Sequence, residues 1–345
     1  MQNFLYNNKI VNHLIALESH KVNLSLLEIS NDFKSKILNE VKLKNIFFIA
    51  SILGIPQFTI KDAQKFLNSK GFVAESLDYQ VLHNSINAFE FNKSALADTF
   101  NQTDESALLH INRLLILNWR DNWDARFRNF HEKVDETFDR WISLRDTQIN
   151  DDERIRRYKE LLQWFSDVKN DFPFWIKFSR FVFESIRLAP FIAGNQLTTI
   201  IASDFILYKN GYSTKLYMST AEMFALNQQR IIETYQAAVI NGESYWHENF
   251  LQIVLDYFLI LRKNLNKFLA SQEKAKSQPF LELNKRQIKI LKYLQSVPTI
   301  KREDYCHMME VSTMTAFRDL NDLVDKKLLK VEGKGRATKY KLATM

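Results

Sequence analysis

The chain of 345 residues has little of the residue types that build small stapled or loop-rich proteins: it contains one cysteine, seven glycines and five prolines. The single cysteine, Cys306, has no partner for an internal disulfide, and the seven histidines show no metal-ligand spacing with it, so we expect neither a disulfide framework nor structural zinc. No apolar run approaches the ~20 residues that a membrane helix needs. The N-terminus also lacks a basic segment followed by an apolar one, so we expect no secretory signal, no membrane span and a cytoplasmic protein.

The rest of the composition is typical of a globular protein. Hydrophobic residues make up 46% of the chain and charged residues 25%. The length is sufficient for two domains that each have a core. These values exclude a small stapled protein and a disordered one.

Basic charge is concentrated at the C-terminal end of the chain. Residues 281–345 hold 14 Lys and Arg against 8 Asp and Glu, whereas residues 1–280 hold 33 against 32. A compact basic module at the end of a neutral body favours a polyanion as the partner of that module. Double-stranded DNA is therefore the expected partner.

The middle of the chain is predicted to be helical. Glycine is absent from residues 72–193, and the apolar residues of 108–141 recur about every 3.7 residues, which is close to the helix period. These residues are Leu108, Ile111, Leu115, Trp119, Trp123, Phe127, Phe130, Val134, Phe138 and Trp141. They predict a long helix with an aromatic core face, with Asn118 or Asn122 as the place for a single break. Further helices are predicted over residues 153–168, 174–187, 197–209 and 246–269.

A change in composition and hydrophobic periodicity marks a second domain. Residues 271–280 are polar, have little periodicity and contain a proline, so they are predicted to be a linker. Beyond the linker, we predict helices over residues 284–295, 301–310 and 313–327 and short strands over 328–331 and 338–342. In the first of these helices, Ile288, Leu291 and Leu294 are expected to point inward. Three helices followed by a hairpin are the order of a winged helix-turn-helix, which we assign to residues 281–345.

The third helix of this module is predicted to have one buried face and one exposed face. Ser312 is predicted to cap the helix. The buried stripe is Ala316, Leu320, Leu323 and Val324. The residues expected to contact DNA are Ser312, Thr313, Met314, Phe317 and Arg318 on this helix, and Lys334, Arg336 and Lys339 on or beside the wing. Winged helices also dock proteins or form dimers. The apolar members of this set suit a protein partner as well as they suit DNA, so a protein-docking module stays open as an alternative.

A loop in the middle of the chain carries a family resemblance. Residues 189–197 read Ala-Pro-Phe-Ile-Ala-Gly-Asn-Gln-Leu and lie between two predicted helices. This segment resembles the signature loop of the Fic/DOC family, whose pattern is His-Pro-Phe-x-Asp/Glu-Gly-Asn-Gly-Arg with a second Arg three residues later. Pro190, Phe191, Gly194 and Asn195 keep the pattern. The resemblance covers most of the chain and implies a mainly α fold, with an N-terminal helical segment over 1–100 and a Fic-like helical core over 101–270.

Members of this family typically transfer AMP from ATP to a protein hydroxyl, with the His of the loop as base, its acidic residue as magnesium ligand and its two arginines holding phosphate. By this resemblance, Ala189 stands in place of the base, Ala193 in place of the metal ligand, and Leu197 and Ile200 in place of the arginines. We therefore interpret Ala189, Pro190, Phe191, Gly194 and Asn195 as a degenerate nucleotide loop, with no catalytic residue, metal site or cofactor. The family also carries a target-docking β-hairpin before the loop, where this chain is predicted to be helical over residues 119–141.

These observations predict a mainly α, Fic-like protein that has lost its catalytic residues and regulates transcription by binding DNA through its winged helix. The helical body would serve as a dimerisation or sensing module, and a homodimer is expected if the winged helix reads a palindrome. Two alternatives stay open. One is a nucleotide-binding, AMPylating enzyme that uses other residues, such as His247 or Glu248 as base, with ATP and magnesium as cofactors. The other is a protein-interaction scaffold.

Overall fold

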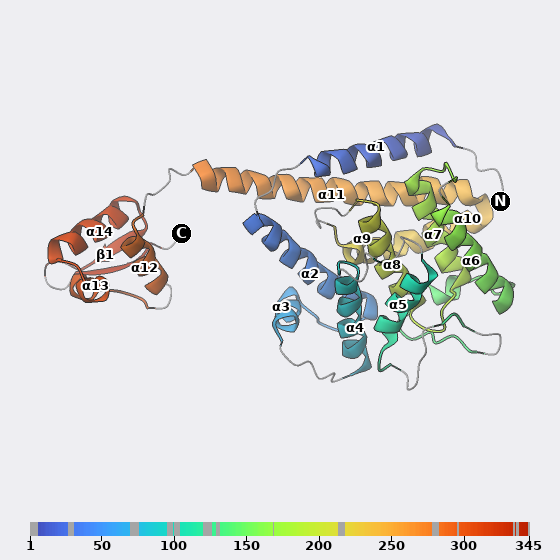
Figure 1. Cartoon of the computed structure of the whole chain (residues 1–345), viewed down its shortest axis with the longest axis horizontal. Coiled ribbons are helices and arrows are strands. Elements are labelled where there is room, and N and C mark those ends of the chain that lie inside the picture. Colours follow the sequence, from blue (N-terminus) through green and yellow to red (C-terminus); the bar gives the residue numbers. More distant parts are fainter. Residues whose placement is uncertain are drawn as a thin grey trace. The chain divides into compact units, whose positions relative to one another are not determined.

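The computed structural model describes residues 6–26, 31–69, 76–94, 99, 104–119, 126–128, 132–167, 169–212, 218–277, 283–294, 297–333, 335 and 338–343. For residues 25, 31–33 and 268–277, the backbone alone is described. The chain divides into two compact units, Met1–Lys263 and Asn264–Met345. We call the first unit the body and the second the C-terminal unit (Figure 1).

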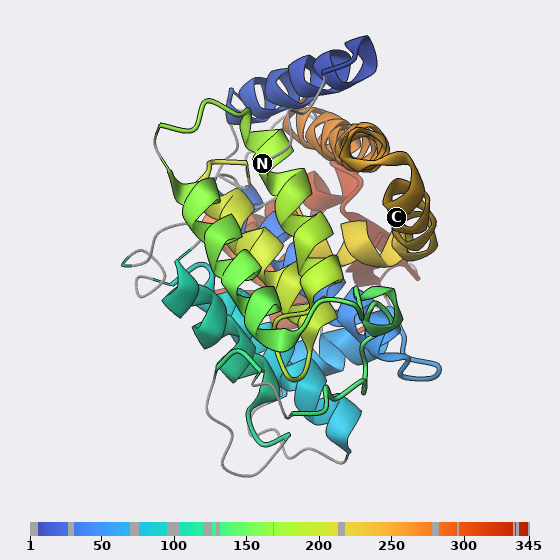
Figure 2. The same ribbon diagram turned by 90° about the vertical axis from the view of Figure 1, so that its right-hand side faces the viewer.

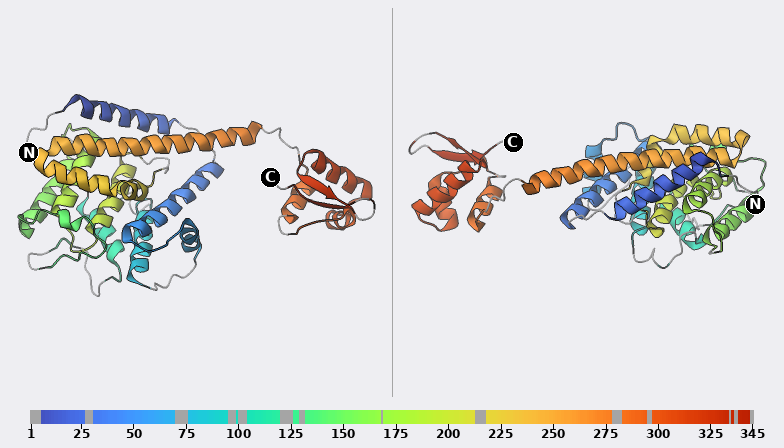
Figure 3. Two further views of the ribbon diagram at one scale, coloured as in Figure 1. Left: turned by 180° about the vertical axis from the view of Figure 1, so that it is seen from behind. Right: turned by 90° about the horizontal axis from the view of Figure 1, so that it is seen from above.

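The body is built of helices. They are α1 (Asn8–Ser25), α2 (Asn31–Leu53), α3 (Ile60–Asn68), α4 (Leu77–Phe91), α5 (Glu105–Ile116), the 3₁₀ helix η2 (Ile142–Leu144), α6 (Asp151–Ser166), α7 (Phe174–Leu188), α8 (Asn195–Lys209), α9 (Thr220–Leu226), α10 (Gln228–Asn241) and the part of α11 (Glu243–Ser277) up to Lys263. Helices α6 and α7 lie side by side (Figure 2). Helix α1 lies along α11 (Figure 3), where Asn7 and Lys9 each donate a hydrogen bond of 2.8 Å to Glu248. The expected mainly α architecture is confirmed.

Helix α8 is the centre of the body core. Every residue from Asn195 to Leu207 is buried, because α8 packs against α4, α5, α7 and α9. Such a helix has no exposed polar face, and two of its hydroxyl side chains, Thr199 and Ser203, donate to backbone carbonyls of the helix itself. Ser203 Oγ, for example, donates to the carbonyl oxygen of Thr199 at 2.7 Å. The loop that precedes α8 is therefore held from inside the core.

The prediction of one long helix over residues 108–141 is wrong. Helix α5 ends at Ile116, and Asn118 has a φ of 60°, a left-handed conformation that breaks a helix and that Asn tolerates. Residues 126–128 and 132–141 then run as irregular chain, with single bridges from Phe127 to Phe191 and from Asp135 to Ala193. Two backbone N–H groups of this segment, those of Arg128 and Asp135, donate to carbonyl oxygens of the loop 189–197, at Pro190 and Ile192. The apolar spacing predicted burial correctly, since Phe127, Val134 and Trp141 are buried.

The part of the periodic stripe around Trp123, Phe130 and Asn122 lies outside the described residues. The other four helix predictions of the body are confirmed as α6, α7, α8 and α11, with ends that differ by a few residues. Helix α11 is longer than predicted, because it continues to Ser277. Residues 271–277, which were predicted to be part of a linker with little periodicity, are helical, and they contain Ala, Gln, Glu and Lys and neither Gly nor Pro. Residues 278–280 lie outside the described residues.

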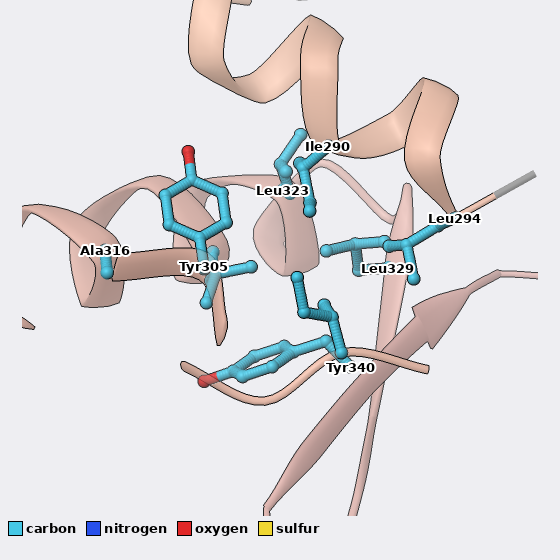
Figure 4. Packing of buried hydrophobic residues seen from close by; sticks show 9 residues of the cluster. Ile290, Leu294, Tyr305, Ala316, Leu323, Leu329 and Tyr340 are labelled. Carbon is cyan, nitrogen blue, oxygen red and sulfur yellow. The ribbon is translucent and has the colours of Figure 1, made fainter. Parts of the chain in front are cut away.

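The C-terminal unit contains α12 (Lys285–Tyr293), α13 (Arg302–Met309), α14 (Thr313–Asp325), β1 (Leu329–Glu332) and β2 (Lys339–Leu342). The two strands pair antiparallel, from Leu329 opposite Leu342 to Glu332 opposite Lys339, and Ile300 adds a bridge to Tyr340. Its core consists of Ile290, Leu294, Ile300, Tyr305, Ala316, Leu320, Leu323, Leu329 and Tyr340 (Figure 4). Three helices and a hairpin enclose one small core, as predicted for a winged helix-turn-helix.

One inward prediction in this unit is wrong. The side chain of Ile288 is 44% exposed, and Ile290 takes the buried place beside Leu294. Helix α12 is rotated relative to the prediction because Gln287 is also buried, where its amide bonds the carbonyl of Asp319. In the described part of the chain, no helix combines the length and apolar character needed to cross a membrane.

Candidate nucleic-acid interface

The start of α14 is defined by a tight turn and a side-chain cap. Glu310 has a φ of 53°, which ends α13, and Ser312 is extended and accepts a hydrogen bond from the backbone N–H of Thr315 at 3.3 Å. A serine at this position satisfies an amide that the helix itself leaves open. The predicted cap is confirmed, and the turn that separates the two helices is fixed by local chemistry.

Helix α14 has the two predicted faces. Ala316, Leu320 and Leu323 are fully buried, whereas Val324 is half-buried. The exposed residues at the start of the helix are Thr313, Met314, Phe317 and Arg318. Met314 is 61% exposed and Phe317 41%. The structure thus brings four of the predicted contact residues together on the first two turns of one helix face, next to Ser312.

A buried carboxylate holds α14 in place, and the sequence analysis missed it. Asp319 accepts hydrogen bonds from Arg286 Nε at 2.8 Å, Asn284 Nδ2 at 2.8 Å and the Tyr305 hydroxyl at 2.9 Å. Burial by itself would raise the pKa of Asp319, but these three hydrogen bonds outweigh it and lower the pKa below its ordinary value. The signal in the sequence is an acidic residue three positions after Ala316, on the buried stripe. This network ties α14 to α12 and α13.

The hairpin supplies further basic side chains. Opposite and alternate residues of paired strands point to the same face. One face of the hairpin therefore carries Lys330 opposite Lys341 and Glu332 opposite Lys339. Lys339 is exposed, as predicted, and Lys330 is a second exposed lysine that the prediction missed. Lys341 forms an ion pair with Glu332. The predicted wing contacts Lys334 and Arg336 lie outside the described residues.

The second predicted site, the loop 189–197, is a closed turn in the body core. Asn195 is bonded to Phe191 twice at 2.8 Å, since its Oδ1 accepts from the backbone N–H and its Nδ2 donates to the carbonyl. Ala189 ends α7 with a φ of 40°, and Gly194 begins α8 with a φ of 67°. A Cβ on Gly194 would lie 2.8 Å from Cδ2 of Leu115. The residues that keep the family pattern therefore shape and pack the turn.

The backbone amides at the start of α8 face a carboxylate of the chain itself. Asp139 is buried, and its oxygens accept hydrogen bonds from the backbone N–H groups of Gln196 at 3.3 Å and Trp141 at 3.1 Å, with Asn195 as a further amide partner. Burial raises the pKa of Asp139 to about 6, although the amide hydrogen bonds oppose the rise. The space between Asp139, Ala189, Asn195 and Gln196 has no room for a water molecule. An internal anion thus lies where a helix start would otherwise attract a phosphate.

The remaining loop positions offer no cation at this place. Leu197 and Ile200 are fully buried among apolar residues. Among the described residues, no group of three His, Cys, Asp or Glu side chains is arranged to hold a metal ion. Of the residues considered for other chemistry, His247 is buried with its Nδ1 3.0 Å from Ser179 Oγ, and burial lowers its pKa to about 3. Glu248 is paired with Lys9.

The two units define a class of protein: a helical body that carries a winged helix-turn-helix module. Residues 286–338 match the family model of the DeoR-like helix-turn-helix domain. No curated protein sequence matches the chain.

Solved structures resemble the fold over most of its length. A Fic family protein from Desulfovibrio desulfuricans G20 has a TM-score of 0.72 at 14% identity and covers 99% of this chain and 98% of its own. A Fic-1 fragment from C. elegans has a TM-score of 0.58 at 12% identity over 76% of this chain and 73% of its own. A Fic domain containing signaling protein from Bacteroides thetaiotaomicron VPI-5482 has a TM-score of 0.50 at 16% identity over 72% of this chain and 95% of its own. The protein therefore has a Fic-like fold with a DeoR-like helix-turn-helix at its C-terminal end.

Proposed function

We propose that the protein is a DNA-binding transcriptional regulator that acts through its C-terminal unit. The observation that carries the proposal is the exposed cluster Thr313, Met314, Phe317 and Arg318 at the capped start of α14. In a helix-turn-helix, this is the part of the recognition helix that enters the major groove. The exposed lysines of the hairpin are suited to phosphate contacts. The match of residues 286–338 to the DeoR-like domain supports the same reading.

We further propose that the body is catalytically degenerate and needs no cofactor. Three features support this: Ala189, where the resembling family has its base; the buried Leu197 and Ile200, where that family has arginines; and the Asp139 carboxylate at the start of α8. A carboxylate at that position repels a phosphate that would otherwise use the same amides. In this proposal, the body serves dimerisation or sensing in the cytoplasm, and a homodimer matches a palindromic operator.

The test is DNA binding by the full chain, measured by fluorescence anisotropy on a duplex from its own upstream region. Arg318→Ala should weaken binding by about 1 to 3 kcal/mol if Arg318 reads guanine. Arg113→Ala is the matched control, because it removes an exposed arginine from α5 of the body and should leave the affinity unchanged. Equal affinities of the two variants and the unmodified chain would count against the recognition helix and favour the scaffold alternative.

A further inference from the structure

The start of α14 carries an unusual set of exposed side chains for a groove-reading helix. Two of its four exposed residues, Met314 and Phe317, are large and apolar, and Thr313 adds a methyl group beside them. Arg318 is the single charged member of the set. Large apolar side chains that gather on a surface mark an interaction site. Because Ser312 and the Asp319 network fix this end of the helix, the set is presented in one orientation.

We propose that Met314 and Phe317 read the C5-methyl groups of thymine, so that the DNA sites of this protein contain thymine at the positions these side chains face. The inference rests on the proposed function and names the bases that it recognises. Apolar contact with the thymine methyl is one of the direct readouts available in the major groove. The four exposed residues include no Asn, Gln, Asp or Glu, which are the side chains that pair with adenine or cytosine edges.

The spacing of the two residues fits this readout. Positions three apart lie on the same face of a helix and are separated by about 4.5 Å along its axis. This separation is comparable to the rise of about 3.4 Å between base pairs. Met314 and Phe317 therefore reach neighbouring base steps of one groove. Arg318, next in sequence to Phe317, adds a donor that suits guanine or a phosphate.

A DNA duplex fits the surface better than a protein partner because of the net charge of the unit that carries it. The same unit presents exposed Lys330 and Lys339 on its hairpin, and residues 281–345 carry 14 basic against 8 acidic residues. A duplex supplies both an apolar methyl row inside the groove and negative charge along its edges. One ligand therefore suits both the apolar pair and the net positive charge of the unit.

The experiment uses a duplex that the full chain itself recovers from a randomised pool. That duplex is then synthesised with thymine, and again with uracil, which keeps the base-pairing edge and lacks the methyl group. Binding of the uracil form should be weaker by about fourfold for each methyl group that is removed from contact. In a third form, each contacted T·A pair is replaced by C·G with and without a C5-methyl group on cytosine, and the methylated form should bind more tightly.

Variants assign the effect to the two side chains. Met314→Ser and Phe317→Ser should each bring the thymine-to-uracil ratio of affinities toward one, and Arg318→Ala should leave that ratio unchanged. Ile288→Ser is the matched control, because it removes an exposed apolar residue from α12 of the same unit and should also keep the ratio.

The outcomes separate the two proposals. Recovery of a duplex that binds its thymine and uracil forms equally would overturn the methyl readout and leave DNA binding intact. Recovery of no duplex at all would overturn the proposed function, and the methyl readout with it.

Discussion

The starts of α8 and α14 satisfy their first backbone amides in two different ways. Each helix follows a tight turn and leaves its first backbone amides without partners inside the helix. At α14, Ser312 caps the helix, and the side chains around the cap are exposed. At α8, Gly194 provides no side-chain cap, the surrounding residues are buried, and the Asp139 carboxylate comes from another segment to meet the amides. One helix start is open to a ligand, while the other is closed by the chain itself.

The two helix starts show that the backbone geometry of a segment and its chemical function are separate properties. In the turn before α8, Phe191, Gly194 and Asn195 bond and pack against their own neighbours. A fold does not by itself carry an activity. The exposed start of α14, by contrast, has local features that point outward and that no neighbour in the described unit covers.

The largest expected effect comes from a substitution that disrupts the packing at the buried start of α8. Gly194→Ala combines a side chain at a φ of 67° with a Cβ 2.8 Å from Leu115 Cδ2, and should lower the free energy of unfolding of the body by about 2 to 5 kcal/mol. Gly242→Ala is the control, because its φ is 88° and nothing lies within 4 Å of the added Cβ. Its cost should be about 1 to 3 kcal/mol, from backbone strain alone. Thermal unfolding of both variants measures the difference, and equal losses would contradict the packing role of Gly194.

The Asp139 carboxylate at the start of α8 makes the stability of the body depend on pH. The pKa of Asp139 rises on folding from 3.8 to about 6, so the folded body binds this proton more tightly than the unfolded chain. Its contribution therefore favours folding most below pH 4 and is lost as the pH rises toward about 6, which amounts to about 2 to 3 kcal/mol.

Asp139→Asn should remove this part of the pH profile of stability, because an amide does not titrate in that range. The titration of other groups should remain in both profiles, since burial raises the pKa values of Glu184 and Asp204 and lowers that of His247, which acts with the opposite sign. Urea unfolding at pH values from 4 to 7 gives the two profiles. Superimposable profiles of the variant and the unmodified chain would count against a titrating Asp139.

The stability of the C-terminal unit depends less strongly on the Ser312 cap of α14. Ser312→Ala should lower the stability of the C-terminal unit by about 1 kcal/mol, because the amide of Thr315 loses its acceptor. Ser312→Asp should retain most of the stability, since aspartate caps as well as serine does. Denaturation followed by far-UV circular dichroism measures both. If the Ala and Asp variants lose the same stability, the cap has no energetic role.

The smallest expected effect concerns a single phosphate contact. Lys339→Ala should weaken binding to all duplexes alike and reduce the slope of log affinity against log salt concentration by about one. Lys263→Ala, which removes an exposed lysine from α11, is the control and should keep the slope. A loss confined to one DNA sequence would contradict a phosphate role for Lys339.

How much the sequence predicts differs between the two regions for a physical reason. The start of α14 is local: Ser312 caps within three residues, and the stripe through Leu320 follows the helix period. Its elements and exposed face are therefore predictable. The Asp139 contact joins segments more than fifty residues apart, and no local pattern encodes it.

The wrong prediction over residues 108–141 has a related cause. A period near 3.7 is typical of a helix, but Phe127, Val134 and Trp141 are buried within irregular chain that bridges to the loop before α8. Burial is set by tertiary contacts, and several backbone paths place every third or fourth side chain inward. Asn118, one of the two residues predicted as the place of a break, has a φ of 60° just after the end of α5, so that part of the prediction is confirmed.

The central claim is that the protein binds DNA through the open start of α14 and no nucleotide at the closed start of α8. The most direct measurement is the affinity of the full chain for its own upstream duplex and for a random duplex, at two salt concentrations, with and without ATP and magnesium. The account predicts salt-dependent binding that favours the upstream duplex and does not change with ATP. Binding no stronger than that of a weakly basic surface, or an affinity that shifts when ATP is added, would contradict it.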